Sequence, residues 1–384
     1  MRSYKILEYA LTSLLRRPGK TFAILLVYML MIAVLASVLF LTQALKTEAT
    51  TMLDAGPELI VQKTLAGRHE LIPVAVAAQL AAIPGVKEVT SRVWGYYYDA
   101  LVEANYTLQA FDATDDTLTL LDGRLPRGEE ECAIGSGVAA IRRVSLGDDL
   151  ILIDYDNIGR IFTVTGVFDT RSDLLTQDLI VMPDGPLRQF FGMSDQVATD
   201  LAVRVYNPSE IDTIANKVKR IVPDSRPITQ RELLRTYHAV FDWRGGMMLA
   251  LFSSALLAFC ILAWDKATGL SAGERREIGI LKAIGWDTAD VLQLKLYEGL
   301  ALSLLAFLGG LLIAFLLVFF WGAPLLGEVL RGWSVLFPAL KPTPFIDPYQ
   351  IATLAFLTIV PYVASTIIPA WRAAIADPDD VMRG

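Results

Sequence analysis

The sequence predicts an α-helical membrane protein with four transmembrane helices and one large extracytoplasmic α+β domain. Three observations carry this prediction. Four uncharged apolar runs reach the length of about 20 residues that a helix needs to cross a bilayer. A segment of globular composition, residues 42–245, separates the first run from the second. Lys and Arg concentrate in the short segments on one side of the resulting topology.

The four predicted spans are residues 21–41, 246–264, 299–320 and 351–369. The first run is longer than the apolar core of about 7–15 residues found in cleaved signal peptides. We therefore expect an uncleaved anchor at this position.

The distribution of basic residues predicts the orientation of these spans. Segments 1–20 and 265–298 each hold five Lys and Arg residues, and the 15-residue segment 370–384 holds Arg372 and Arg383, whereas the 30-residue loop 321–350 holds only two basic residues. Both termini and the 265–298 loop are therefore expected in the cytoplasm. The 42–245 domain and the 321–350 loop are expected outside, and residues 1–20 are expected to form an amphipathic helix.

Within the outer domain, a strand–helix–strand pattern occurs twice. Between the two copies lies a strand-rich stretch, punctuated by glycines, which we assign to an inserted β-rich subdomain at about residues 115–192. The outer domain is therefore expected to be a split α/β unit. The predicted strands and helices of the two copies are residues 59–63, 73–85 and 86–93, and residues 201–206, 207–221 and 225–230.

Composition excludes several functional classes. With two Cys and two His in 384 residues, neither a disulfide framework nor a His- or Cys-rich metal site is expected. The net charge of −7 argues against a nucleic-acid partner. The tripeptide Gly19–Thr21 lacks the earlier glycine and the preceding strand of a phosphate-binding loop, so no nucleotide cofactor is expected. We identify no catalytic constellation and do not expect an enzyme.

The aromatic strand WGYYYD, Trp94–Asp99, admits two interpretations. It could form a platform for a ligand, or it could serve packing or an interface. Alternating aromatic residues in a strand more often serve packing or an interface, and the sequence leaves the alternative open.

The segment SAGERREIGILKAIGWD, residues 271–287, joins two predicted spans. Ile278, Leu281 and Ile284 recur every three residues, which predicts one apolar stripe on a short helix. Gly285 is a candidate left-handed residue after its last turn. The segment is either a docking helix or a solvated connector.

Small residues recur every four positions in the third span, at Ala306, Gly310 and Ala314. This spacing allows a second helix to approach closely, although ordinary small-residue filling gives the same pattern.

Several motifs together resemble the FtsX-like permeases. GERREIGILKAIGW followed by YEGLALSLLAFLGG is similar to the cytoplasmic loop and next helix of that family. EYALTSLLRRPGKT and PAWRAAIADPDDVMRG resemble its first helix and its C-terminal signature. GPELIVQK, IPGVKEV and DGRLPRGEEECAIGSGVA resemble the periplasmic core domain of MacB-type transporters.

The resemblance implies the membrane subunit of an ATP-binding-cassette (ABC) transporter in a bacterial inner membrane. Such permeases act as dimers, here expected to be homodimers, with ATPase subunits bound on the cytoplasmic side. Because no ATPase domain is fused to this sequence, the ATPase is expected on a separate chain. The residues expected to couple to that ATPase are Glu274, Arg275, Arg276, Glu277, Ile278, Gly279, Leu281, Lys282 and Gly285.

Three outputs remain open within this family: efflux with a periplasmic adaptor and an outer-membrane channel, lipoprotein release, and activation of a cell-wall hydrolase. Efflux is the first expectation. A membrane receptor with an outer sensory domain is a more distant alternative, but the short cytoplasmic segments leave little room for an output domain. Membrane lipids are expected partners in every case.

Overall fold

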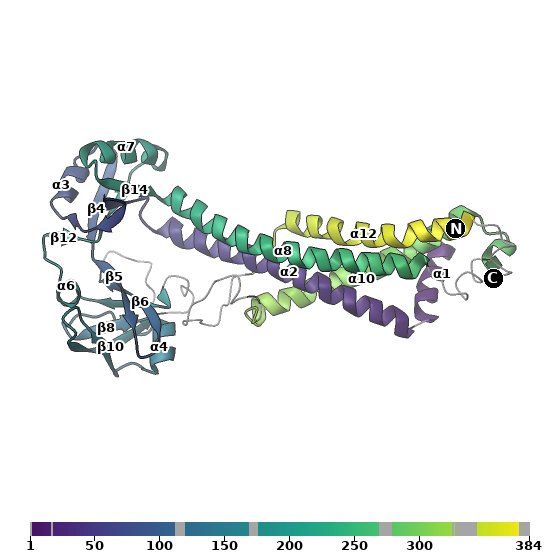
Figure 1. Cartoon of the computed structure of the whole chain (residues 1–384), viewed down its shortest axis with the longest axis horizontal. Coiled ribbons are helices and arrows are strands. Elements are labelled where there is room, and N and C mark those ends of the chain that lie inside the picture. Colours follow the sequence, from purple (N-terminus) through teal and green to yellow (C-terminus); the bar gives the residue numbers. More distant parts are fainter. Residues whose placement is uncertain are drawn as a thin grey trace. The chain divides into compact units, whose positions relative to one another are not determined.

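The computed structural model describes residues 2–16, 18–111, 120–168, 176–268, 279–324, 326 and 344–375. The chain divides into two compact units. The helical unit comprises Met1–Ala44, Asp242–Leu330 and Pro342–Gly384, and the outer unit comprises Leu45–Phe241 and Arg331–Lys341. Figure 1 shows the helices and strands of both units.

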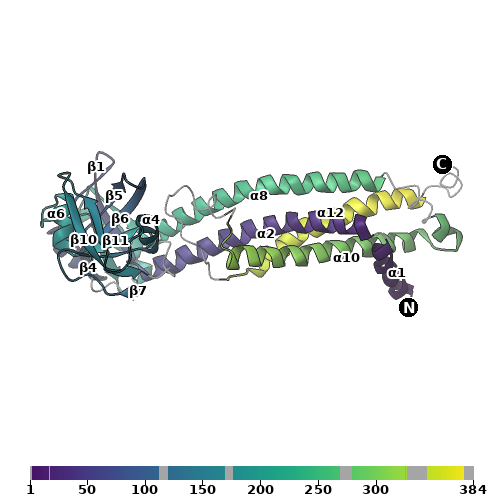
Figure 2. The same ribbon diagram turned by 90° about the horizontal axis from the view of Figure 1, so that it is seen from below.

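Long helices build the helical unit, and Figure 2 shows α2, α10 and α12 running along one another in a second view. The start of α1 and the end of α12 lie at the same end of this unit in both figures. The helices are α1 (Arg2–Arg16), α2 (Pro18–Ala55), α8 (Gln230–Thr268), α10 (Thr288–Phe315) with its π-helical continuation η3 (Leu316–Phe320), and α12 (Pro348–Ile375).

Three helices in the described part of the chain are long and apolar enough to cross a membrane. They are the segments Thr21–Thr51, Thr288–Phe320 and Pro348–Ile368. The predicted span at residues 246–264 lies inside α8, a single helix of 39 residues. Four helices therefore occupy the predicted positions, while the membrane crossing of α8 stays a prediction.

Two of these helices are much longer than the apolar runs that predicted them. α2 has 38 residues, with Pro18 at its first position, where the missing N–H of proline costs nothing. At 1.5 Å per residue, helices of this length extend to about 57 Å, well beyond the roughly 30 Å of a bilayer core. The division between the two units falls within α2 and within α8.

Buried polar contacts join α2 to α12 inside the helical unit. The Tyr28 hydroxyl donates to the Thr358 carbonyl at 2.5 Å, and the Tyr28 ring stacks on Tyr362 with 4.8 Å between ring centroids. Near the outer end of these helices, the Gln350 amide donates to the Gln43 side-chain oxygen at 3.1 Å. Because hydrogen bonds require a defined geometry, these bonds fix how α2 and α12 are aligned along each other.

The first sheet of the outer unit is the predicted split α/β unit. Its strand order is β14-β1-β13-β4, and all neighbouring pairs are antiparallel. The two strand–helix–strand copies interlock, because each contributes one central and one edge strand. Their elements are β1 (Leu59–Leu65), α3 (Val76–Ala81) and β4 (Val86–Arg92), then β13 (Asp200–Val205), η2 (Pro208–Glu210), α7 (Ile211–Ile221) and β14 (Ser225–Thr229).

An apolar core lies between this sheet and its two helices, and three short strands complete the subdomain. β2 (Arg68–Glu70) pairs antiparallel with the end of β1, and β3 (Ile72–Pro73) pairs antiparallel with β12 (Val197–Ala198). The core residues are Leu59, Val61, Ile72, Leu80, Ile83, Val86, Ala198, Leu201, Val203, Val205, Ile211, Ile214 and Val218.

The second sheet forms the inserted β-rich subdomain, in the order β5-β6-β11-β8-β10-β7, with β9 paired to β10. It begins at Trp94, earlier than the boundary expected near residue 115, because the aromatic strand β5 and its partner β6 belong to it. Its strands are β5 (Trp94–Asp99), β6 (Ala104–Ala110), β7 (Leu120–Gly123), β8 (Glu131–Ile134), β9 (Asp149–Ile153), β10 (Gly159–Phe168) and β11 (Leu179–Met182).

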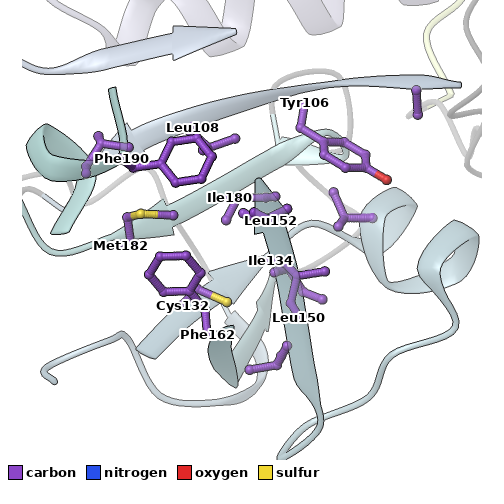
Figure 3. Close-up of a cluster of buried hydrophobic side chains, with 14 of the residues drawn as sticks. Tyr106, Leu108, Cys132, Ile134, Leu150, Leu152, Phe162, Ile180, Met182 and Phe190 are labelled. Carbon is purple, nitrogen blue, oxygen red and sulfur yellow. The ribbon is translucent and has the colours of Figure 1, made fainter. Parts of the chain in front are cut away.

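Two short helices, α4 (Ser136–Arg142) and α6 (Asp184–Phe191), accompany the core of this subdomain. Figure 3 shows side chains from β6, β8, β9, β10, β11 and α6 gathered into one cluster. Alternation along β9 explains the arrangement, since Leu150 and Leu152 are buried while Ile151 and Ile153 are exposed. The labelled core residues are Tyr106, Leu108, Cys132, Ile134, Leu150, Leu152, Phe162, Ile180, Met182 and Phe190.

A hydrogen-bonded ion pair lies where the chain passes from β4 of the first sheet to β5 of the second sheet. Arg92, at the end of β4, donates to both carboxylate oxygens of Asp200 at 2.7 and 2.8 Å. The Trp94 indole N–H donates to the same carboxylate at 3.0 Å. Asp200, the first residue of β13, is buried and accepts three hydrogen bonds from Arg92 and Trp94. These bonds hold the end of β4 and the start of β5 against β13.

Candidate functional site

The candidate site is the junction between α1, the short helix whose described part is residues 279–283, and the start of α10, all in the helical unit. Ile6 and Ala10 of α1 are buried together with Leu281 and Leu294. Tyr9, Trp286 and Tyr297 pack around them, partly buried. One apolar cluster therefore joins three segments. The short helix and α10 are consecutive in the sequence, whereas α1 lies far from both.

Polar contacts reinforce this cluster. The Ser13 hydroxyl donates to the Glu298 carboxylate, and the Lys295 ammonium lies 2.7 Å from the other oxygen of Glu298. The Tyr9 ring packs against Trp286 with 5.8 Å between centroids, and the Arg16 guanidinium lies 5.4 Å from the Tyr9 ring centroid. The Ser13–Glu298 bond joins α1 to α10 directly, and the Tyr9–Trp286 contact joins α1 to the turn before α10, whereas the other two contacts lie within α10 and within α1.

The short helix ends in a Schellman motif, which two hydrogen bonds define. The Trp286 N–H donates to the Leu281 carbonyl at 3.0 Å, and the Gly285 N–H donates to the Lys282 carbonyl at 3.0 Å. Gly285 has φ +95°, the left-handed region that a residue without Cβ adopts most readily. This agrees with the cap expected from the sequence. Leu281 and Trp286, which the motif brings together, both belong to the apolar cluster.

A capping box starts α10 immediately afterwards. The Asp287 side chain accepts from the backbone N–H of Asp290, and the Asp290 side chain accepts from the Asp287 N–H at 3.0 Å. A left-handed stop at Gly285 followed by a capped start at Asp287 sets a sharp turn between the two helices. The short helix is therefore held at a defined angle to α10.

The predicted apolar stripe is divided between two surfaces. Leu281 is 5% exposed inside the cluster, whereas Ile284 is 69% exposed and Ile280 is 55% exposed. At about 100° per residue, Ile284 lies about 40° from Ile280 and about 60° from Leu281, so it groups with Ile280 on the free side. Ile280 was not among the predicted coupling residues, although its i, i+4 spacing to Ile284 was a usable signal.

The remaining predicted coupling residues are distributed as follows. Gly279 is buried, Lys282 is half-buried and Gly285 is exposed. Glu274, Arg275, Arg276, Glu277 and Ile278 lie outside the described residues. The structure therefore places four of the nine predicted residues, all of them on or beside the short helix.

The first helix also presents a second apolar face. Tyr4, Leu7, Leu11 and Leu15 are exposed and recur at intervals of three or four residues. Ile6 and Ala10, which pack on α10, occupy the other side. An amphipathic helix with one face docked and one apolar face free is suited to lie at a membrane surface.

The predicted small-residue positions lie between helices of the same chain. Ala306, Gly310 and Ala314 are buried. A Cβ added at Gly310 would lie 2.8 Å from Ile32 Cγ2 and 2.9 Å from the Met29 carbonyl oxygen. The absence of a side chain at Gly310 therefore allows α10 to approach α2 closely.

The structure shows packing on one side of the aromatic strand β5, and the ligand-platform interpretation stays a prediction. Tyr97 faces the core and stacks on Tyr106 with 6.2 Å between centroids. Tyr96 and Tyr98 face outward and are 72% and 57% exposed. The side of β5 that carries Tyr97 packs on the core, and the side that carries Tyr96 and Tyr98 is exposed.

Two chemical features of the described residues concern metal ligation and the environment of the Cys132 thiol. No group of three or more His, Cys, Asp and Glu side chains that could hold a metal ion occurs among the described residues. Burial raises the pKa of the Cys132 thiol to about 12, which keeps that thiol protonated and a poor nucleophile near neutral pH.

Two family models match the sequence, and together they cover most of the chain. Residues 21–221 match the MacB-like periplasmic core domain, and residues 248–378 match the FtsX-like permease C-terminal domain. An uncharacterised ABC transporter permease of Methanocaldococcus jannaschii is 22% identical over 336 residues, which cover 80% of this chain and 79% of that protein.

Two solved structures are also similar. The periplasmic region of MacB from Actinobacillus actinomycetemcomitans has a TM-score of 0.35 at 14% identity, covering 48% of this chain and 94% of that one. The extracellular domain of YknZ, a noncanonic ABC-type transporter from Gram-positive bacteria, has a TM-score of 0.32 at 17% identity, covering 44% of this chain and 92% of that one.

The MacB-like model alone spans more than half of the residues, and the permease model follows it in the order seen here. The chain is therefore a multi-pass membrane protein that belongs to the FtsX-like ABC transporter permeases with a MacB-like periplasmic core domain.

Proposed function

We propose that this permease couples ATP hydrolysis on a separate ATPase chain to conformational work by its outer unit. Two permease chains, here two copies of this one, would bind two ATPase subunits at the junction of α1, the short helix and α10. In this proposal both termini and the junction lie in the cytoplasm, and the protein is in the inner membrane of a bacterium.

The observation that carries the proposal is the free apolar pair Ile280 and Ile284. Two isoleucines on a charged, capped, firmly packed helix are a small anchor of the kind that inserts into a pocket of a partner. The buried Leu281 fixes the helix on α1 and α10, so force applied to the pair would reach α10 directly. We propose that Glu274, Arg275, Arg276, Glu277 and Lys282 form a charged rim around this anchor.

The two long helices support transmission of that force. α2 and α8 are uninterrupted over 38 and 39 residues, and each continues from the helical unit into the outer unit. Within the outer unit, the Thr50 hydroxyl and the His238 ring nitrogen lie 3.2 Å apart, and the Gln230 side-chain amide donates to the Leu53 carbonyl at 2.5 Å. A displacement at the cytoplasmic end would therefore be passed outward by hydrogen-bonded helices.

We propose that the outer unit uses this motion for efflux, together with a periplasmic adaptor and an outer-membrane channel. Lipids would contact the free face of α1, and Lys5 on the same helix would suit anionic headgroups. Lipoprotein release and hydrolase activation share the same cytoplasmic coupling and differ in the protein that meets the outer unit.

The test replaces both exposed isoleucines with aspartate, Ile280→Asp/Ile284→Asp, in the tagged full-length chain. We expect an ABC ATPase to copurify with the wild-type chain in detergent and to be reduced at least tenfold with the double variant. Ile221→Asp, which changes an exposed isoleucine of α7 in the outer unit, is the matched control and should retain the ATPase.

Two results would overturn this assignment. If no ATPase copurifies with the wild-type chain, the permease does not use a separate ATPase as proposed. If the double variant retains the ATPase at wild-type stoichiometry and turnover, the isoleucine pair is not the coupling contact. Leu281→Asp is unsuitable here, because a charge at this buried position would disrupt the junction itself.

A further inference from the structure

The outer edge of the aromatic strand β5 is the feature from which we draw a further inference. β5 lies at the end of the seven-stranded sheet and pairs only with β6 among the described strands. An edge strand presents backbone N–H and C=O groups on its free side, and natural proteins usually protect such groups.

The hydrogen bonds of β6 establish which β5 residues face the free edge. In an antiparallel ladder, residues alternate between facing the partner strand and facing away from it. The Thr107 N–H donates to the Asp178 carbonyl at 2.9 Å, so Thr107 faces β11 and not β5. Tyr96 lies opposite Thr107, so the N–H and C=O of Tyr96 point outward. Tyr98 has the same parity, and its backbone groups point outward too.

Trp94 shares this parity and already has a partner on the free side. The Thr199 hydroxyl accepts from the Trp94 N–H at 3.0 Å and donates to the Trp94 carbonyl at 2.7 Å. The Thr199 hydroxyl thus satisfies both outward backbone groups of Trp94, as a neighbouring strand would do. Among the described residues, no hydrogen bond reaches the outward backbone groups of Tyr96 and Tyr98.

Two other edge strands of the outer unit, β14 and β4, are protected by their composition. Pro227 in β14 has no N–H to offer, and Lys87 and Glu88 place exposed charges on β4. Both devices discourage the addition of another strand. From Trp94 to Tyr98, β5 contains neither a charge nor a proline.

The edge of β9 is protected by side chains. The Arg142 guanidinium donates to the Ile151 carbonyl at 3.0 Å, and the Ile153 N–H donates to the Tyr97 hydroxyl at 3.0 Å. The contrast lies within one sheet: side chains bond the outward groups of Ile151 and Ile153 in β9, whereas the edge of β5 is open beyond Trp94.

The residues of β5 that face inward hold the open edge rigid. Gly95 lies against the Phe191 ring, where a Cβ would approach to 2.8 Å. Tyr97 meets Phe190 edge-on at 5.6 Å, and Asp99 is bonded to Arg142 at 2.9 Å. A strand that is already ordered loses little conformational freedom when another strand pairs with it.

We propose that the β5 edge is a strand-addition site that takes an extended peptide segment of a partner protein outside the membrane. The outward groups of Tyr96 and Tyr98 would pair with the peptide backbone, and their exposed rings would pack on its alternate side chains. The site depends only on the geometry of the outer unit and not on the ATPase partner.

A peptide fits this edge better than a second copy of the chain. The open stretch runs only from Tyr96 to Tyr98, which is short for the roughly 800 Å² per partner of a stable protein interface. A flexible peptide can continue past the strand and add contacts with its own side chains. Its affinity is therefore expected in the micromolar range.

The experiment selects ten-residue peptides from a phage-displayed random library on the purified full-length chain in detergent. Selected peptides are then synthesised with N-methyl groups on alternate amides. Methylation of one set should weaken binding at least tenfold, while methylation of the other set should leave it within twofold. This alternation distinguishes backbone pairing from side-chain contact, because only every second peptide N–H faces β5.

Variants of the chain locate the site. Tyr96→Pro removes an outward N–H that the β5–β6 ladder does not use, and it should weaken binding at least tenfold. Tyr96→Ser retains that N–H and should weaken binding less. Tyr206→Ser removes a tyrosine that is 73% exposed in the other subdomain, and it should have no effect.

Four outcomes overturn the proposal: selection of no peptide, equal loss on methylating either set of amides, full binding by Tyr96→Pro, or displacement of the peptide by concentration-dependent dimerisation through β5. If Tyr96→Pro does not fold, Tyr98→Pro and the methylated peptides on the wild-type chain still decide the question.

Discussion

The guanidinium of Arg142 donates to the carboxylate of Asp99 across 2.9 Å, with both side chains nearly buried. This bond joins the last residue of α4 to the last residue of β5. A second donation from Arg142, to the Ile151 carbonyl at 3.0 Å, brings β9 into the same arrangement. One side chain therefore connects three elements of the β-rich subdomain.

We predict that Arg142→Met lowers the free energy of unfolding of the outer unit by about 3–5 kcal/mol, since it leaves the Asp99 charge buried without its partner. Pulse proteolysis of the full-length chain across a urea series measures the change. The double variant Asp99→Asn/Arg142→Met, which removes the charge as well, should be less destabilised than Arg142→Met alone. Equal destabilisation of both would contradict the role of the ion pair.

The second prediction concerns Gly135, where the neighbouring backbone leaves no room for a side chain. A Cβ at this position would lie 1.8 Å from the Thr176 carbonyl oxygen, and backbone atoms cannot move aside as a flexible side chain can. Gly135→Ala should therefore destabilise the outer unit by about 3 kcal/mol or more. Gly185→Ala, in α6, meets no atom within 4 Å and is the matched control. Comparable stability of the two variants in the same proteolysis assay would refute this explanation.

Two adjacent glycines of α10 provide a test within the membrane. A Cβ at Gly310 would crowd the Met29 carbonyl oxygen, whereas a Cβ at Gly309 would meet only the flexible end of the Met29 side chain. Gly310→Ala should lower stability by about 1–3 kcal/mol, and Gly309→Ala should change it little. Thermal unfolding of the purified chain in one detergent compares them. The packing of α2 on α10 is misassigned if Gly309→Ala is the more damaging change.

The buried thiol of Cys132 predicts a reactivity pattern. Burial raises its pKa to about 12, so at pH 8 the thiolate required for alkylation is scarce, and the thiol itself is inaccessible. In a Cys260→Ser background, a maleimide should fail to label the folded chain at pH 8 and should label it fully in denaturant. Rapid labelling of the folded chain would show that the β-rich core opens readily.

Much of the fold was accessible from sequence patterns. Four uncharged runs of bilayer length predicted the long helices, and two strand–helix–strand patterns predicted the split α/β unit, because each pattern repeats with the period of its own secondary structure. The boundary of the β-rich subdomain was placed too late, at residue 115. The strands β5 and β6 continue directly from β4, and only their pairing with β11 assigns them to the second sheet.

The sequence by itself predicted the long apolar helices, the family and the glycine stop at Gly285, since each depends on local composition or on a contiguous motif. Only the tertiary structure decided which face of the short helix is free and which edge of the β-rich sheet is open. Leu281 and Ile284 are equally apolar, and Tyr96 and Tyr97 are the same amino acid. Their different environments depend on α1, α10 and β6, which are brought beside them by packing that no local pattern encodes.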